Sequence, residues 1–554
     1  MAPINLAADA LHAEKHRWPG ENFEQAMDRV ANATSDDFVH LIELMPILRG
    51  RRFLPGGRIQ LAVGSGKNVT GLNCYVSGTI ADSMVDGDGS IMQRVMEAAA
   101  TMRMGGGIGY DFSPLRPEHA LIKKLGAASS GPLSFMEIFN ATCKAIASAG
   151  KRRGAQMGIM RVDHPDIEKF IESKNNKTAL TNFNLSVAIT DEFMVAVQND
   201  LSFDLRFEDK VYKTISAKAL WDKLMRSTYD YAEPGVVFID TINRMNNLWY
   251  CETIAATNPC AEQPLPPHGA CLLGSFNLTQ YVASRVFDYE RFTADIWHVV
   301  RMMDNVIDET IYPLPAQKAE ALSKRRMGLG YTGLANAIEY CLGRPSYGDP
   351  DFLAMQEKIT RTLCNEAYMA SIDLAKEKGA FPLYDDRYLE GNFIRGLPED
   401  IQEGIAAHGI RNSHLTSIAP TGSISMGAGN VSSGCEPVFS YEQTRLVNGE
   451  PVDLNDYGVT YLGIKGRRTA DVTIDQHLAV LGATVPYIDS AVSKTCNVPT
   501  DIAFEDFEHV YMRAWEMGVK GCTTFRLGGK REGILESKDS QVCVINADGS
   551  RSCD

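Results

Sequence analysis

The feature that most limits the possible fold is the alternation of short apolar runs with longer amphipathic runs. Three runs have the length and apolar character of buried strands: residues 184–189 (NLSVAI), 235–239 (GVVFI) and 415–418 (LTSI). Apolar residues recur at helical spacing between or after them, in residues 191–199, 217–231, 290–310 and 351–378. Strands that alternate with helices favour an α/β fold in which most strands are parallel.

The N-terminal part is predicted to be helical. Residues 22–50 carry two amphipathic repeats, and residues 89–104 and 131–149 each carry another. No low-complexity linker divides the middle of the chain. We therefore expect three parts: a helical layer over residues 1–50, one large α/β core over residues 51–530, and a flexible tail over residues 531–554.

Composition and charge exclude several classes of protein. The chain has 554 residues, of which 44% are hydrophobic, as in ordinary globular proteins. It has no apolar run of the roughly 18 residues that a membrane span requires, and its N-terminus has no apolar core of a secretion signal. The formal net charge of -14 argues against nucleic-acid binding. The sequence therefore predicts a cytoplasmic protein that binds neither membrane nor nucleic acid.

The cysteines and histidines do not predict a metal site. The 12 cysteines are scattered, and no two have the Cys-x-x-Cys spacing of a zinc ribbon or a thioredoxin motif. The histidines do not lie at metal-ligand spacing with cysteines or carboxylates. In a reducing cytosol, most of these thiols are expected to be buried and inert.

The segment most suggestive of chemistry is residues 257–278 (TNPCAEQPLPPHGACLLGSFNL). It places Asn258, Cys260 and Glu262 at alternate positions, so an extended backbone would put all three side chains on one face. Four nearby prolines favour a stiff loop over a helix. Taken alone, such a motif is equally consistent with a reactive thiol and with a buried structural cysteine.

Other motifs accompany this segment in a definite order. Residues 258–262 (NPCAE) followed by 271–278 (CLLGSFNL) resemble the active-site loop of the ribonucleotide reductase large subunit. Further similarity to this family is found at residues 71–74, 104–109, 129–132, 151–155, 161–166, 419–425 and 434–439. The resemblance implies a ten-stranded α/β barrel of two antiparallel five-stranded halves around a central finger loop, with the helical N-terminal layer beside it. Residues 51–530 would form this catalytic domain.

The resemblance also implies roles for five residues in the reduction of ribonucleotides to 2′-deoxyribonucleotides. Cys260 would become a thiyl radical and abstract the ribose 3′-hydrogen. Glu262 would accept the 3′-OH proton as a general base, and Asn258 would hold the ribose. Cys74 would protonate the departing 2′-hydroxyl and then form a disulfide with Cys271, which supplies two electrons.

Several other residues are expected to bind the ribonucleotide. Residues 419–425 resemble the loop that holds the substrate phosphates, a task that suits backbone N–H groups at a helix N-terminus. The predicted substrate contacts are Asn73, Gly107, Pro259, Ala261, Pro420, Thr421, Gly422, Ser423 and Ile424. Residues 54–58 (LPGGR) depart from the family, whose members usually carry a Ser/Thr-bearing turn there, so no hydroxyl contact is expected from this turn.

The route of radical formation separates the classes of this family. Class I large subunits receive the radical through an adjacent Tyr-Tyr pair, but residues 521–527 (GCTTFRL) contain no tyrosine. Anaerobic class III enzymes need a glycyl-radical motif, which is absent, and lack the loop glutamate, which is present as Glu262. Residues 520–526 (KGCTTFR) resemble class II enzymes, which depend on adenosylcobalamin and need no radical-carrying subunit.

Two alternatives stay open at this point. One is a class I large subunit that needs a separate radical-generating subunit. The other is a non-enzymatic, nucleotide-binding homologue, against which the five intact active-site residues argue.

Regulation and reduction can be predicted from the same resemblance. The positions that match the site of a dNTP or ATP specificity effector are Asp82, Arg116, Lys151 and Arg152. The long insertion of monomeric class II enzymes is absent, which favours a homodimer. Cys543 and Cys553 in the tail are expected to reduce the active-site disulfide and to be reduced in turn by a thioredoxin- or glutaredoxin-type protein.

Overall fold

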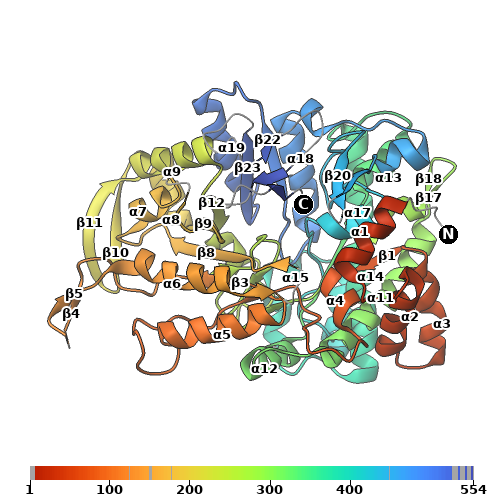
Figure 1. The fold of residues 1–554 in the computed structure, drawn as a ribbon, viewed down its shortest axis with the longest axis horizontal. Helices are drawn as coiled ribbons and strands as arrows, with labels where there is room; N and C mark the ends of the chain where they lie inside the picture. Colours follow the sequence, from red (N-terminus) through yellow and green to blue (C-terminus); the bar gives the residue numbers. More distant parts are fainter. Residues whose placement is uncertain are drawn as a thin grey trace.

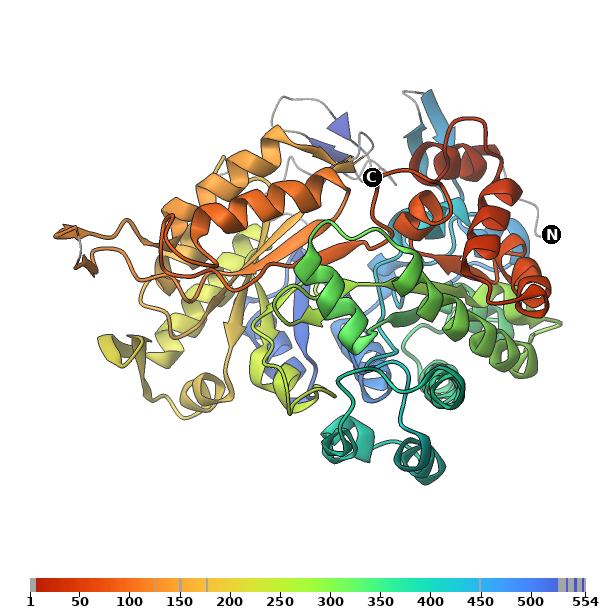
Figure 2. The same ribbon diagram turned by 90° about the horizontal axis from the view of Figure 1, so that it is seen from below.

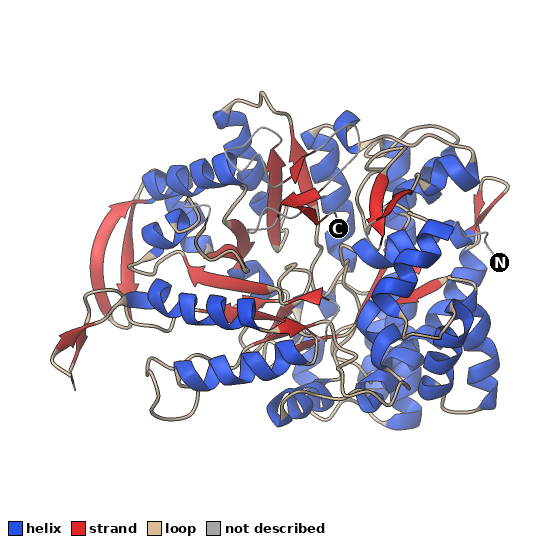
Figure 3. Cartoon of the chain, in the orientation of Figure 1, coloured by secondary structure: helices blue, strands red, loops and turns tan. Residues whose placement is uncertain are grey.

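The computed structural model describes residues 6–123, 125–148, 152–175, 178–447 and 450–526, and three short strands beyond them: β24 (Leu535–Glu536), β25 (Cys543–Ile545) and β26 (Arg551–Ser552). Helices and strands alternate along most of the chain, and in Figure 3 helices surround a central group of strands. The predicted α/β class is confirmed.

The largest sheet has eight strands, and most of its neighbours are parallel. Its order is β15 (Ala270–Cys271), β2 (Cys74–Val76), β3 (Gly107–Asp111), β8 (Gln156–Arg161), β9 (Phe183–Ile189), β12 (Gly235–Phe238), β23 (Gly521–Arg526) and β22 (Thr495–Val498). The five strands from β2 to β12 are parallel to one another, and β15 is antiparallel to β2. The direction reverses between β12 and β23, and β22 is again parallel to β23.

A second sheet of three strands joins β1 (Phe53–Pro55), β16 (Leu273–Asn277) and β19 (Gly328–Thr332). β16 and β19 are parallel, and β1 is antiparallel to β16. Residues 415–418 were predicted to form a strand, but here they make only single parallel bridges, Leu329 with Thr416 and Ile418 with Val492. The two predicted strands at 184–189 and 235–239 are confirmed as β9 and β12.

The predicted helices are present with small differences at their ends. They are α2 (Phe23–Thr34), α3 (Phe38–Arg49), α5 (Ile91–Arg103), α6 (Gly131–Ala145), α8 (Asp191–Gln198), α9 (Ala217–Tyr231), α11 (Tyr289–Glu309) and α14 (Pro350–Lys378). α6 ends four residues earlier than predicted because the chain turns into the hairpin of β6 (Ala147–Ser148) and β7 (Arg152–Arg153).

The remaining elements connect or cover these sheets. The further helices are α1 (Leu6–His16), α4 (Gly57–Ala62), α7 (Ile167–Glu172), α10 (Ile239–Arg244), α12 (Pro315–Lys324), α13 (Leu334–Leu342), α15 (Asn392–Arg395), α16 (Glu399–His408), α17 (Gly422–Gly427), α18 (Ile474–Thr484) and α19 (Phe504–Glu516), with single turns η1 (Leu278–Tyr281), η2 (Asp386–Glu390), η3 (Gly458–Leu462), η4 (Thr469–Asp471) and η5 (Val485–Tyr487). Two-stranded hairpins are formed by β4 (Leu121–Ile122) with β5 (Ala127–Ala128), β10 (Ser202–Phe207) with β11 (Lys210–Ser216), β13 (Ala256–Thr257) with β14 (Pro264–Leu265), β17 (Val282–Ala283) with β18 (Val286–Phe287), and β20 (Thr444–Val447) with β21 (Glu450–Asp453).

Local sequence explains where the N-terminal helices begin. Asn22 accepts a hydrogen bond from the backbone of Gln25, whose side chain bonds back to Asn22, so α2 starts with a capping box. Asp37 caps α3 through the backbone N–H of His40. Each cap satisfies a backbone donor at the helix start that has no partner within the helix.

Two apolar cores lie on different sides of the molecule. α2 and α3 contribute Phe23, Val30 and Leu48 to a core that also contains Val299 of α11, so this part of the N-terminal layer packs on the second half of the chain. Helices α5, α6, α8 and α9 pack on strands β3, β8 and β9 of the large sheet, and their apolar side chains form a separate core. Figures 1 and 2 both place residues 90–230 (orange to yellow) on one side and the N-terminal helices with α11 and α14 on the other.

Candidate active site

The segment around Cys260 is a hairpin loop between β13 and β14. The backbone N–H of Asn258 donates to the Gln263 carbonyl (3.1 Å), and the Gln263 N–H donates back to Asn258 Oδ1 (3.0 Å). The Ala261 N–H bonds to the Asn258 carbonyl, and Ala261 itself has a φ of 63°. We call residues 258–263 the finger loop.

The turn at its tip changes the expected placement of the three motif residues. An extended segment would have put Asn258, Cys260 and Glu262 on one face. Because Ala261 adopts a left-handed conformation, the backbone reverses instead. Asn258 and Glu262 are buried, whereas Cys260 is exposed at the tip. The segment is therefore a turn and not the extended strand on which the single-face prediction depended, and Cys260 is more exposed than its two neighbours in the motif.

The finger loop lies directly against the large sheet. A Cβ atom added to Gly109 on β3 would lie 2.9 Å from the carbonyl carbon of Thr257 and even closer to its oxygen. One on Gly107 would lie 3.1 Å from Cys74 Sγ and 3.2 Å from Pro259 Cγ. Asn184 of β9 donates its side-chain N–H to the Pro259 carbonyl at 3.1 Å. Glycines on β3 therefore leave room for the loop, and Asn184 fixes its tip.

The other arm of the loop contacts the second half of the chain. The Glu262 carbonyl accepts hydrogen bonds from the Ser417 hydroxyl (2.8 Å) and the Ala491 N–H (3.0 Å). Gln263 reaches the Ser490 hydroxyl at 3.3 Å. The carbonyl bonds hold the backbone of Glu262 in place while its carboxylate side chain lies in a buried environment.

Two of the predicted redox cysteines face each other beside this loop. Cys74 on β2 is directly opposite Cys271 on β15 in an antiparallel pairing, and both side chains are buried. The side-chain nitrogen of Asn258 lies 3.8 Å from Cys271 Sγ. Burial raises the pKa of the Cys271 thiol well above its usual value, and nearby Glu262, Cys74 and Cys260 raise it further. The five predicted catalytic residues are thus brought together, with both Cys271 and the loop close to Cys74.

Asn73 precedes Cys74 and also lies in this region. Its N–H donates to the Cys271 carbonyl (3.1 Å), and its own carbonyl accepts from the Gly107 N–H (3.1 Å). The half-buried side chain lies close to Gly56, where a Cβ would be 3.2 Å from it. Asn73 and Gly107 therefore border the cysteine pair, and their contact with the substrate stays a prediction.

The predicted phosphate loop is a rigid turn into a short helix. Thr421 precedes α17 with a φ of 54°. Its hydroxyl lies 3.0 Å from that of Thr332 and accepts the Gly434 N–H at 2.8 Å. Pro420 and Gly422 are exposed, Ser423 is half-buried, and Ile424 is buried in a small apolar cluster with Leu54. The exposed side of this turn is open to a ligand.

Two of the predicted effector residues form an ion pair. Arg116 Nε lies 2.5 Å from Asp82 Oδ2, and the Arg116 N–H donates to Asp82 Oδ1 at 3.2 Å. Both side chains are partly exposed. Lys151 lies outside the described residues, and of Arg152 only the backbone, in β7, is described.

Two basic residues of the motif at residues 520–526 anchor β23, one at each end of the strand. Lys520 is buried, and its Nζ donates to the carbonyls of Asp489 and Ser490, on the segment that precedes β22. Burial lowers the pKa of Lys520 to about 8. Arg526 donates to the Tyr229 and Thr500 carbonyls (both 3.1 Å). These long basic side chains hold the strand in place from its two ends.

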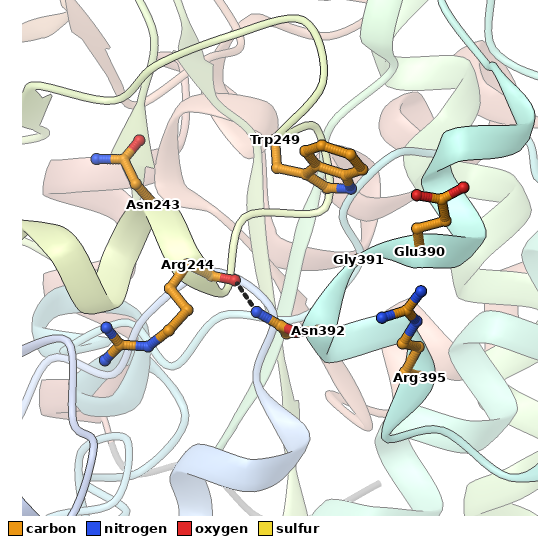
Figure 4. A pocket seen from close by; sticks show the side chains of 7 residues that line it. All are labelled: Asn243, Arg244, Trp249, Glu390, Gly391, Asn392 and Arg395. Atoms are coloured by element: carbon orange, nitrogen blue, oxygen red, sulfur yellow. Dashed lines mark hydrogen bonds between the residues drawn. The ribbon is translucent and has the colours of Figure 1, made fainter.

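Sequence reasoning missed two features. One is His16 of α1, whose Nε2 lies 3.1 Å from Ser423 Oγ in the phosphate loop. The other is an open cavity of about 390 Å³ lined by Asn243, Arg244, Trp249, Glu390, Gly391, Asn392 and Arg395 (Figure 4). No sequence motif marks either, because both arise where distant segments meet. None of the predicted site residues lines the cavity.

The predicted tail cysteines are only partly covered by the structure. Cys553 lies outside the described residues, and for Cys543 only the backbone, in β25, is described. Among the described residues, no helix combines the length and the apolar character needed to cross a membrane.

Comparison with known proteins supplies the family. The model of the ribonucleotide reductase barrel domain matches residues 72–467 and 467–525. A vitamin B12-dependent ribonucleoside-diphosphate reductase of Mycobacterium tuberculosis (strain CDC 1551 / Oshkosh) is 32% identical over 98% of this chain and 82% of its own length. One of Thermoplasma acidophilum is 33% identical over 94% of this chain and 69% of its own length. A ribonucleoside-diphosphate reductase subunit alpha of Chlamydia muridarum is 28% identical over 80% of this chain but only 46% of its own length.

The match covers the finger loop, the cysteine pair and the phosphate loop, all of which lie between residues 72 and 467. The relatives that resemble the whole chain carry the same family name as the barrel model. The chain belongs to the ribonucleotide reductase family.

Proposed function

We propose that the chain is the catalytic chain of an adenosylcobalamin-dependent reductase that converts ribonucleoside diphosphates into 2′-deoxyribonucleoside diphosphates. The observation that carries this proposal is the convergence of Cys260, Glu262 and the opposed pair Cys74 and Cys271 at one loop. The names of the relatives from M. tuberculosis and T. acidophilum support both the diphosphate substrate and the dependence on vitamin B12.

The environments of these residues suit their proposed roles. Cys260, exposed at the loop tip, accepts the radical and abstracts the 3′-hydrogen of the ribose. Buried Glu262 takes the 3′-OH proton. Cys74 gives a proton to the leaving 2′-hydroxyl, which departs as water. Cys74 and Cys271 form a disulfide, which supplies the two electrons, and Cys271 also gives up the hydrogen that replaces the hydroxyl at C2′. Glu262 returns the proton to the 3′ oxygen, and Cys260 returns the hydrogen atom to C3′ and becomes a thiyl radical again. The high pKa of Cys271 keeps this thiol protonated until that step.

The residues around the finger loop fit adenosylcobalamin as the radical source. When bound, this cofactor supplies radical chemistry through homolysis of its cobalt–carbon bond. Asn184 and Ser186 are two residues apart on β9 and therefore lie on the same face of the sheet. Gly235 of β12 pairs with Ser186, and Thr523 of β23 lies on the other side of Gly235. Asn184 bonds to the loop, so this small polar face lies on the loop's side of the sheet. Asn184, Thr523 and Cys260 would border the cofactor.

We infer the ten-stranded barrel from two runs of strands. The parallel run β2, β3, β8, β9 and β12 is followed antiparallel by β23, which begins the second run. β22 comes next, and the bridges at Val492–Ile418 and Thr416–Leu329 lead on to β19 and β16. The description of the matching family model as a barrel domain supports this reading. The part from residue 51 to 530 would form this catalytic domain, beside the helical layer of residues 1–50.

Partners and regulation follow from the family. The substrate phosphates would bind at residues 420–424, and a dNTP or ATP effector would bind near Asp82 and Arg116 in a homodimer. The exposed side chains of Met84 and Val85, which follow Asp82 in the sequence, and of Met92 and Met96 on α5 support a partner surface there. A thioredoxin- or glutaredoxin-type protein would restore the thiols through the tail of residues 531–554. The cytoplasmic location and the independence from nucleic acid stay predictions.

The deciding experiment is an assay of the purified chain alone. With adenosylcobalamin, dithiothreitol and a ribonucleoside diphosphate, we expect deoxynucleotide to form. Cys260→Ser is expected to abolish this while nucleotide binding, measured by calorimetry, survives, because a serine O–H bond is too strong to replace the thiol as radical carrier. Turnover only after addition of a separate radical-generating subunit would instead identify a class I large subunit. Deoxynucleotide formation by Cys260→Ser would overturn the thiyl assignment.

A further inference from the structure

The last turn of α1 lies against the phosphate loop, although the two segments are far apart in the sequence. His16, at the end of α1, is buried and places Nε2 3.1 Å from Ser423 Oγ. One turn earlier, His12 packs on α17, where a Cβ at Gly427 would lie 3.2 Å from its ring. Figure 1 shows α1 (red) beside α17, as the contacts between these helices require.

A glycine makes room for the His16 ring. A Cβ atom on Gly57 would lie 2.5 Å from His16 Nδ1 and would overlap the carbon beside it. Real Cβ atoms do not approach other atoms that closely, so a larger residue at position 57 is incompatible with this place for the ring. Gly57 belongs to the turn that lacks the hydroxyl usual in the family.

Ser423 is the residue of the phosphate loop whose hydroxyl can turn toward a ligand. The Thr421 hydroxyl is engaged with Thr332 and Gly434 inside the protein. No heavy atom beyond its chain neighbours lies within 4 Å of the Cβ position of Gly422, so the loop is open there. Ser423 is half-buried, with His16 on its protein side.

The tautomer of His16 determines which way the serine proton points. A hydroxyl has one hydrogen and two lone pairs, and an imidazole nitrogen either donates or accepts. If His16 Nε2–H donates to Ser423 Oγ, the serine hydrogen is left for another acceptor. Phosphate oxygens only accept hydrogen bonds, so this orientation matches a bound phosphate. An accepting Nε2 would withdraw the hydrogen and turn an oxygen lone pair toward the anion.

We propose that His16 is a positioning residue for substrate binding, which donates to Ser423 and aims the serine hydroxyl at a phosphate of the ribonucleoside diphosphate. This inference rests on the proposed function, since it takes residues 420–424 as the phosphate loop. It gives α1 a part in substrate recognition.

The test compares His16→Ala with His16→Gln, whose side-chain N–H can replace the imidazole donor. Loss of one well-aligned donor is expected to raise KM, and the Kd of the diphosphate measured by calorimetry without cofactor, by about five- to tenfold. kcat should stay within about twofold, because the phosphate is held equally before and during the reaction. His16→Gln should recover most of the affinity. Gly57→Ala should act like His16→Ala, because it displaces the ring.

A double-mutant cycle with Ser423→Ala separates the possible explanations. If His16 acts through Ser423, the double variant should bind no worse than Ser423→Ala alone. Multiplied losses would overturn the inference, and so would an unchanged KM in His16→Ala beside a raised KM in Ser423→Ala. An unchanged KM in Ser423→Ala itself would also remove the phosphate loop from the proposed function.

Leu11→Ala is the matched control for the packing of α1. Leu11 lies in an apolar cluster with Ala7, Ala8 and Leu454, which touches α17 at Met426 and includes neither His16 nor Ser423. This variant should lower the melting temperature and leave the Kd unchanged. A rise in its Kd equal to that of His16→Ala would mean that α1 acts only by packing, and the positioning role would be wrong.

Discussion

Replacing Gly109 by alanine is the sharpest test of how the finger loop is positioned. The added Cβ would lie 2.9 Å from the carbonyl carbon of Thr257 and nearer still to its oxygen. The Cβ is fixed to the backbone of β3, and the atoms that it meets belong to the backbone of Thr257, directly before the finger loop, so no side-chain rotation can relieve the overlap. The loop or the strand must move.

The size of the movement follows from ordinary contact distances. Carbon atoms in contact prefer a separation of about 3.5–4.0 Å, so this carbon contact alone requires the two backbones to separate by about 1 Å, and the closer oxygen requires more. A displacement of about 1 Å in a reacting group can cost about 100-fold in rate. Overpacking of a dense interior typically costs about 1–3 kcal/mol of stability. Because Cys260 is carried by this loop, we expect kcat to fall much more than stability does.

The assay is deoxynucleotide formation with adenosylcobalamin, together with the free energy of unfolding from urea titration. Gly404→Ala is the matched control, since Gly404 lies in helix α16 and its Cβ would meet only the flexible end of Ile372 at 3.1 Å. There alanine should be neutral or stabilising, by up to about 1 kcal/mol. Normal turnover by Gly109→Ala, with unchanged stability, would refute the idea that close approach at Gly109 positions the loop.

Two further predictions concern other parts of the chain. Arg116→Ala removes the ion pair with Asp82 and should lower the dNTP-dependent change in substrate preference at least about fivefold, measured with two competing ribonucleoside diphosphates, while basal turnover persists. A full effector response would place the effector site elsewhere. Burial raises the pKa of the Asp456 carboxyl from 3.8 to about 6, so the folded state binds more protons than the unfolded state between about pH 4 and 6. Stability should therefore fall by about 3 kcal/mol as pH rises through that window, and urea titrations of Asp456→Asn should lack this fall.

The sequence was sufficient to predict the helices and strands whose apolar residues recur with a strong periodicity. α9 has the predicted bounds, and β9 and β12 lie where short apolar runs predicted buried strands. Residues 415–418 have a similar composition but form only single bridges. Periodicity reports burial, whereas strand pairing depends on neighbours that are distant in sequence, so it could not distinguish these cases.

The candidate site was predictable in its residues but less so in its shape. The motif identified Asn258, Cys260 and Glu262, yet it could not show that a left-handed Ala261 turns the loop. Cys74 and Cys271 are separated by nearly two hundred residues, and only the pairing of β2 with β15 places them opposite each other. His16 carried no signal in the sequence, because its contact depends on how α1 packs on α17.

The finger loop explains why two strands beside it are rich in glycine. β3 carries Gly107 and Gly109, and β19 carries Gly328 and Gly330, in both cases two residues apart and therefore on one face of the strand. A Cβ on Gly107 or Gly109 would meet the first arm of the loop at Pro259 or Thr257, and one on Gly328 would overlap Gln263 on the other arm.

The loop thus lies between β3 and β19, one strand from each run of the proposed barrel, and both strands carry glycines on the face toward it. At Gly109 and Thr257 backbone packs on backbone, a contact that no change of rotamer can relax, whereas Gly107 and Gly328 leave room for the side chains of Pro259 and Gln263. This explains how an exposed cysteine at a loop tip can keep a fixed position relative to the buried pair of Cys74 and Cys271. It also means that the glycines of β3 and β19, which contribute no reactive group, determine where the chemistry takes place.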